Sequence, residues 1–177
     1  MKDVSMMTPS RLHSILALPC LQSLTLRNVR EFNTDDRETL TGQTFSVDEL
    51  SVDGMHVTIL WNFGLHTSCP RVQKLLLDWS AMENVSSDIV TMACSPFHDL
   101  THLHIRGQMP FRASTLNDPV SFCDAVKTSC PRLTKLSLTN IVLTNKKAAE
   151  IIQLLKTHPN LTSIELKTCD TDMDLIH

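Results

Sequence analysis

The residues best suited to chemistry are two histidines and an aspartate in the middle of the chain. His102 and His104 flank one leucine in "HLH", so on a strand both imidazoles would leave from the same face. Together with Asp78 they offer side chains of the types that bind zinc. A metal site needs a further ligand at fixed geometry, and no spacing in the sequence supplies one. We therefore expect no metal and interpret the pair as solvated histidines on a binding surface.

No motif predicts catalysis or a bound cofactor. The four glycines do not fall in the spacing of a phosphate-binding loop. Serine, histidine and aspartate are plentiful, but neither a nucleophile elbow nor a zincin motif is present. We expect a non-enzymatic chain with no catalytic residues and no cofactor.

Composition predicts a single globular domain over residues 1–177, with 42% hydrophobic and 20% charged residues. The net charge of -3 argues against nucleic acid or an acidic membrane as a partner. No apolar run has the length of a membrane span, and Arg11 and His13 interrupt the N-terminal run below signal-peptide quality. The six cysteines form no CxxC pair and are expected to be reduced and buried. We therefore expect a cytoplasmic location.

The elements that must position the histidines follow from a repeated phrase. "CPRVQKLLLDWS" at 69–80 recurs almost unchanged as "CPRLTKLSLTNI" at 130–141. Its aliphatic-x-x-aliphatic-x-aliphatic skeleton occurs six times, at intervals of 25 to 33 residues. The second and third aliphatic anchors are two apart, so each phrase predicts a short strand with one buried face. The anchors are Leu21, Leu24, Leu26; Val47, Leu50, Val52; Val72, Leu75, Leu77; Leu100, Leu103, Ile105; Leu133, Leu136, Leu138; and Leu161, Ile164, Leu166.

Helical patterns stand between most of these strands. The two longest are expected to begin at Asn117 or Asp118 and at Thr144 or Asn145, which are good N-cap residues. Their expected apolar faces contain Val120, Cys123 and Val126, and Ala148, Ile151, Ile152 and Leu155. Shorter helices are expected within 10–18, 57–65 and 86–94, and loops over 30–45 and 107–118.

This phrasing resembles the ribonuclease-inhibitor-like class of leucine-rich repeats over Leu21 to Cys169. Pro70, Pro131 and Pro159, two residues before a first anchor, make it look most like the C-terminal repeat domain of NACHT-type (NOD-like) immune receptors or of F-box repeat proteins. The resemblance implies an α/β solenoid of about six repeats, with a curved parallel sheet on the concave side and helices and loops on the convex side. The family usually has Asn or Cys three residues after the third anchor. Here those positions are Val29, Met55, Ser80, Gln108, Ile141 and Cys169.

The resemblance implies protein recognition in innate immune signalling. A NOD-like receptor domain would sense a ligand or regulate the receptor by contacting an ATPase module. The alternative is the substrate-recognition repeats of an F-box ubiquitin ligase adaptor, although no F-box is visible before Leu21. The sequence ends soon after the sixth expected strand, with no helix to cover the last repeat, so we also expect a fragment of a longer protein.

Residues beside the anchors should point outward onto the concave face and bind a partner there. Their mixed charges favour a protein epitope over a phosphate backbone. Trp79 has two interpretations, an exposed anchor for the partner or a side chain packed into the turn beneath the strand. The predicted contact residues are Lys74, Leu76, Asp78, Trp79, His102, His104, Arg106 and Lys135.

Overall fold

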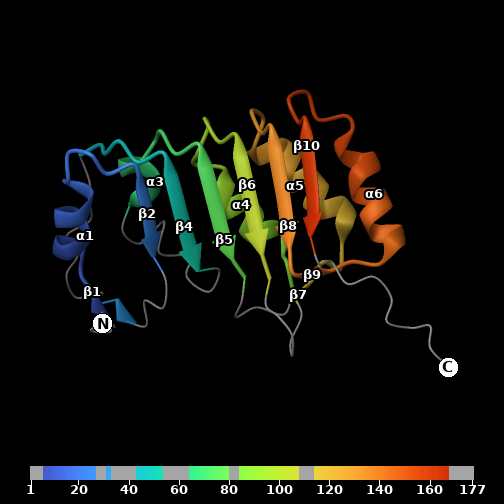
Figure 1. Cartoon of the computed structure of the whole chain (residues 1–177), viewed down its shortest axis with the longest axis horizontal. Helices are drawn as coiled ribbons and strands as arrows, with labels where there is room; N and C mark the ends of the chain where they lie inside the picture. The colour runs from blue at the N-terminus through green and yellow to red at the C-terminus, as the bar shows by residue number, and fades with distance from the viewer. Residues whose placement is uncertain are drawn as a thin grey trace.

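A six-stranded parallel sheet forms the centre of the computed structural model (Figure 1). The structure describes residues 6–26, 31–32, 43–53, 64–79, 84–107 and 114–167. All six predicted strands are confirmed, and their order across the sheet follows their order in the sequence. They are β2 (Ser23–Leu26), β4 (Glu49–Asp53), β5 (Lys74–Asp78), β6 (His102–Arg106), β8 (Lys135–Thr139) and β10 (Ser163–Lys167).

The aliphatic anchors hold the strands in one register. Leu50, Leu75, Leu103 and Leu136 are partners in successive strand pairs, and each is at most 1% exposed. Complete burial of one such side chain contributes about 1.5–3 kcal/mol to folding. In the edge strand β10 the anchors Ile164 and Leu166 are only partly buried, whereas Leu24 and Leu26 in the other edge strand, β2, are buried.

Helices cover one face of the sheet and leave the other face uncovered (Figure 1). Caps predicted from the sequence are present, since Asp118 accepts the N–H of Ser121 and Thr144 accepts that of Lys147. Each cap satisfies one N–H that the first helical turn cannot. The helices are α1 (Pro9–Leu16), α3 (Leu65–Ser68), α4 (Ser87–Cys94), α5 (Pro119–Ser129) and α6 (Asn145–Leu155).

Two predictions about the helix faces were wrong. Val120 and Ile152 are 45% and 41% exposed. In α5 the buried face instead runs through Pro119, Phe122 and Val126, at i, i+3 and i+7. Val120 lies one residue, or about 100° of rotation, beyond Pro119 and so faces away from the sheet. The same offset separates Ile152 from the buried Ile151.

Several smaller expectations also need correction or fall outside the described residues. The loop expected over 107–118 contains β7 (Ser114–Thr115), which pairs with β9 (Ile141–Val142). The loop expected over 30–45 contains β3 (Glu31–Phe32), which pairs with β1 (Met6–Met7). Of the helix expected over 57–65 only Gly64 and Leu65, where α3 begins, are described. Cys20 is exposed, whereas Cys69, Cys94, Cys123 and Cys130 are buried as predicted, and Cys169 lies outside the described residues.

Residues just after the strands occupy matching places. Trp79, Gly107 and Asn140 each stand two residues beyond a third anchor. Each donates its backbone N–H to the carbonyl of the last residue of the next strand, over 2.6, 2.8 and 3.0 Å. Asn140 adopts a φ of 56°, in the left-handed region that asparagine tolerates better than most residues. The chain therefore leaves three neighbouring strands through backbones in direct contact.

A column of threonine hydroxyls joins the other ends of the strands. Thr101, Thr134 and Thr162 each follow a first anchor. Their Oγ1 atoms donate to the carbonyls of Gln73, Thr101 and Thr134, each over 3.1 Å. These bonds add to the strand pairing at the entry of β6, β8 and β10.

None of the helices in the described residues has the length and apolar character needed to cross a membrane.

Candidate functional site

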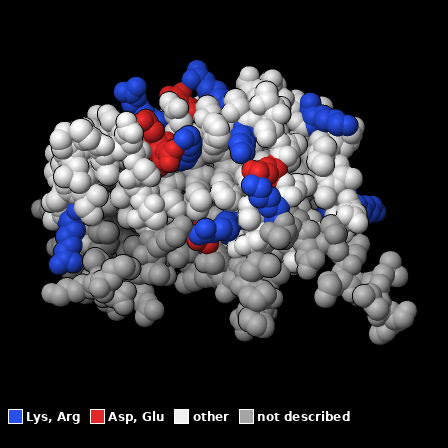
Figure 2. All heavy atoms as spheres, in the orientation of Figure 1, with Lys and Arg blue, Asp and Glu red and all other residues white. Residues whose placement is uncertain are grey.

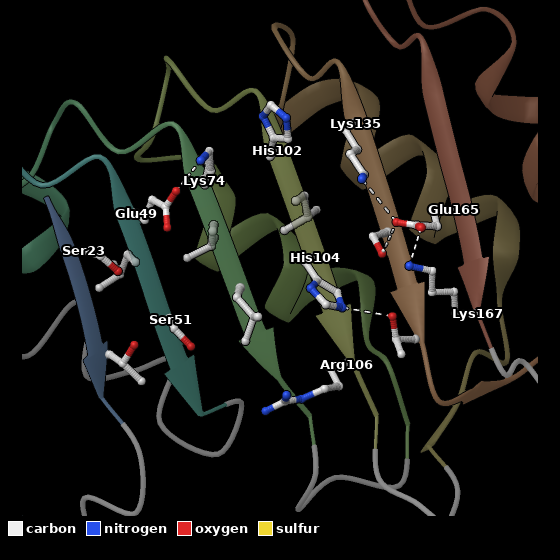
Figure 3. Close-up of a pocket in the computed structure, with 17 residues that line it drawn as sticks. Ser23, Glu49, Ser51, Lys74, His102, His104, Arg106, Lys135, Glu165 and Lys167 are labelled. Atoms are coloured by element: carbon white, nitrogen blue, oxygen red, sulfur yellow. Dashed lines mark hydrogen bonds and ion pairs between the residues drawn. The ribbon is translucent and has the colours of Figure 1, made fainter.

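An open groove of about 650 Å³ runs along the face of the sheet that the helices leave uncovered. Outward-pointing residues of all six strands line it, and Figure 3 shows them side by side. Charged side chains of both signs gather on this face over the middle strands (Figure 2). Six of the predicted contact residues line the groove, namely Lys74, Leu76, His102, His104, Arg106 and Lys135.

Trp79 is not a surface residue, so the interpretation of it as an exposed anchor was wrong. Its side chain is 0% exposed, and its Nε1 donates to the carbonyl of Asn84 over 2.8 Å. Ser114 Oγ donates to the Trp79 carbonyl over 3.3 Å. Trp79 lies two residues beyond Leu77, so it continues the inward alternation of Leu75 and Leu77, and its indole enters the core. Trp79 is therefore a core residue.

Asp78 is also largely buried and does not line the groove. Its carboxylate forms an ion pair with the Arg106 guanidinium on the neighbouring strand. The side chains of Arg106 and Asp78 are 33% and 11% exposed. Arg106 lines the groove, and the Asp78 carboxylate partly neutralises its charge. Asp78 therefore orients Arg106 and is not itself a contact residue of the groove.

His102 lies between two lysines across the strands. Its register partners are Lys74 on β5 and Lys135 on β8. Its Nδ1 lies 2.9 Å from Thr101 Oγ1. Partial burial lowers the pKa of His102, and the positive charges of Lys74 and Lys135 lower it further, although Glu49 opposes them. This environment therefore disfavours the protonated imidazole.

His104 lies one step further along the same face of β6. Its Nε2 is 3.0 Å from Thr139 Oγ1 on β8. Burial is the main cause that lowers its pKa, and Arg106 lowers it further against the opposing charge of Glu165. The two histidines thus share one strand face but have different polar partners. Among the described residues, no three His, Cys, Asp or Glu side chains are close enough together to hold a metal ion.

Three charged residues of the groove were not among the predicted contacts. Lys74 pairs with Glu49 on β4, and Glu165 on β10 accepts from both Lys135 at 3.3 Å and Lys167 at 2.5 Å. Hydrogen bonds from Lys167 and Lys135 lower the pKa of Glu165 to about 2. Glu49, Glu165 and Lys167 occupy the same offsets from the anchors as the predicted residues. Applying the same offsets to the outer strands β4 and β10 would have included these three residues among the predicted contacts.

Ser51 carries a hydroxyl that lacks a hydrogen-bond partner among the described residues. It lines the groove between Thr25 and Leu76, and its Oγ is buried. A buried unsatisfied hydroxyl costs about 1–3 kcal/mol in desolvation. We expect Ser51→Ala to raise the free energy of unfolding by about 0.5–1 kcal/mol, measured by urea denaturation.

Ser137 provides the matched control for this prediction. It holds the same place between two anchors of β8, but its Oγ donates to Glu165 over 3.3 Å. Ser137→Ala should therefore lower the free energy of unfolding by about 0.5–1.5 kcal/mol. If both substitutions shift stability in the same direction, the Ser51 hydroxyl is not the source of the effect.

Neither family models nor curated proteins give a relative of this chain. A scan against models of protein families finds no match to the chain. A search of curated proteins finds none with significant similarity.

Proposed function

We propose that the chain is a leucine-rich-repeat solenoid that serves as a non-catalytic protein-recognition domain, with the groove as its binding surface. The observation that carries the proposal is the groove itself. Outward side chains from six neighbouring strands line an open surface, and the helices pack on the opposite face. Concave surfaces assembled in this way are the binding surfaces of repeat proteins.

The backbone contacts favour the repeat interpretation. Stacked repeats require that each unit contact its neighbours through equivalent residues. Strand order that follows the sequence, the threonine column and the backbone hydrogen bonds of Trp79, Gly107 and Asn140 all have this property. The position three residues before the first anchor behaves similarly, because His158 Nε2 lies 3.0 Å from the carbonyl of Cys130, its counterpart one unit earlier.

The cellular role is proposed from the resemblance of the repeated phrase. On that basis the chain is the ligand-sensing or autoregulatory repeat region of a cytosolic NOD-like innate immune receptor. Its groove would then bind a protein ligand or an ATPase module of the same receptor. The polar and charged lining, with Leu76 as an apolar patch near its centre, has the mixed composition of a protein interface.

We expect substitutions at the centre of the groove to weaken binding more than substitutions on the helices. A partner would be captured from cytosol, identified, purified and tested by calorimetry. Leu76→Ala and His104→Ala should each reduce its affinity by more than about fivefold, because interface hot spots cluster centrally. Trp79→Ala is unsuitable for this test, since it would create a cavity in the core.

The controls lie on α6, on the other side of the sheet. Ile152 is exposed on α6 and Lys156 is its exposed C-cap residue, so Ile152→Ala and Lys156→Ala should leave the affinity within about twofold. If the helical substitutions weaken binding and the groove substitutions do not, the helical side is the working surface and the proposed function of the groove is wrong.

A further inference from the structure

We propose that the groove recognises an acidic segment of a protein partner, whose carboxylates bind at the row formed by Lys74, His102 and Lys135, and that binding tightens as the pH falls. This inference rests on the proposed function and specifies the chemistry of the partner.

The first argument is the balance of charge along the groove. Glu49 and Asp78 each pair with one cation on the β5 side, Lys74 and Arg106. On the other side, Lys135 and Lys167 share the single carboxylate of Glu165. Among the described residues that line the groove are four Lys or Arg side chains, Lys74, Arg106, Lys135 and Lys167, and two carboxylates, Glu49 and Glu165, so cationic side chains are in excess. An anionic group supplied by a partner would restore the balance.

The second argument is the geometry of the row. Lys74, His102 and Lys135 are register partners on three adjacent strands (Figure 3). Neighbouring strands are about 4.8 Å apart, so the row spans about 10 Å. A carboxylate bound over His102 would lie between the two lysines and would compete with Glu49 and Glu165 for their ammonium groups. Leu76, the next outward-facing residue of β5 after Lys74, offers an apolar contact beside the row.

Carboxylates of the protein limit what kind of anion fits. Glu49 and Glu165 stand on either side of the row. A continuous phosphate backbone laid along the groove would meet both of them and be repelled. A peptide can place acidic residues over the row and neutral residues over the two glutamates. The arrangement therefore favours an acidic peptide segment over nucleic acid.

The histidines make this recognition sensitive to pH. The charged groups that face His102 are Lys74 on β5, Glu49 on β4 and Lys135 on β8; partial burial and then the two lysines lower its pKa. A bound carboxylate would favour the protonated imidazole, so the pKa of His102 rises on binding and the complex takes up a proton. Affinity must then increase as the pH falls through the window between the two pKa values.

His104 adds to the same effect more weakly. It faces Arg106 on its own strand, Lys135 and Thr139 on β8, and Glu165 and Lys167 on β10. Partner carboxylates stay ionised down to about pH 5, because their ordinary pKa is near 4. Binding should therefore be tighter at pH 5.5 than at pH 7.5, by up to about tenfold for each unit by which binding raises the pKa of His102.

The experiment titrates the ¹⁵N-labelled full chain with a synthetic peptide of alternating glutamate, serine and leucine residues, followed by NMR. We expect shifts at Lys74, His102 and Lys135 and an affinity at least tenfold higher than that of the same peptide with glutamine in place of glutamate. The double variant Lys74→Gln/Lys135→Gln should lose at least tenfold in affinity. His102→Gln should remove most of the pH dependence.

A matched double variant controls for the overall charge. Lys146→Gln/Lys156→Gln removes two positive charges from exposed positions, one on α6 and one at its C-cap, and should leave binding within about twofold. Equal binding of the glutamine peptide, or equal binding of an RNA oligonucleotide, would overturn the inference. If a captured partner depends on the groove but the acidic peptide does not bind, the acidic inference fails and the proposed function stands. If the captured partner is insensitive to every groove substitution, the proposed function fails as well.

Discussion

Leu103→Asp is expected to unfold the centre of the chain. Leu103 is 1% exposed and pairs with Leu75 on one side and Leu136 on the other. The substitution removes about 1.5–3 kcal/mol of burial and places a carboxylate in the core without a partner, which costs several kcal/mol more. The total approaches the whole stability of an ordinary domain, about 5–15 kcal/mol. Circular dichroism should show loss of the cooperative thermal transition at neutral pH.

A strand position with the opposite orientation gives the control for Leu103→Asp. Ser163 begins β10 and is exposed, so Ser163→Asp should change the free energy of unfolding by less than about 0.5 kcal/mol. An unchanged melting curve for Leu103→Asp would contradict the register, because the side chain would then have to face solvent.

The strands were predictable because their cause is local. Two aliphatic residues at i and i+2 lie on the same face of a strand, so the pair predicts a strand with that face buried. Six copies at similar spacing predict that the strands are parallel neighbours. The same alternation placed His102 and His104 on the open face before any contact was known. The caps at Asp118 and Thr144 were predictable for the same reason, since the cap and its N–H partner are three residues apart.

Features that depend on turns or long side chains were not predictable from the sequence. The inward direction of Trp79 follows the alternation of Leu75 and Leu77, but its contacts with Asn84 and Ser114 join residues further along the chain and could not be predicted. Arg106 pairs with Asp78, and Lys135 and Lys167 both pair with Glu165. These pairs depend on side-chain rotamers, because several oppositely charged residues lie at similar distances along the sheet. The sequence shows which face a charge occupies, and the neighbouring strands determine which charges remain exposed to a partner.

Gly107→Ala should destabilise the chain through backbone contact. An ideal Cβ on Gly107 would overlap the carbonyl oxygen of Asn140 and approach Ser114 Cβ to 3.0 Å. The Asn140 carbonyl cannot retreat easily, because the N–H groups of Gly107 and Asn140 are each bonded to the neighbouring strand. Overpacking of this kind costs about 1–3 kcal/mol, and contact with backbone places the cost at the upper end. A loss of about 3 kcal/mol corresponds to a fall in Tm of about 6–12 °C for a chain of this length, measurable by calorimetry.

Asn140→Gly is the control, because it changes the residue whose carbonyl Gly107 approaches. It removes a side chain at positive φ without adding an atom, and should shift Tm by no more than about 3 °C. If Gly107→Ala were as mild as Asn140→Gly, the backbones at Gly107 and Asn140 would not be in close contact, and the ends of β6 and β8 would not be joined there.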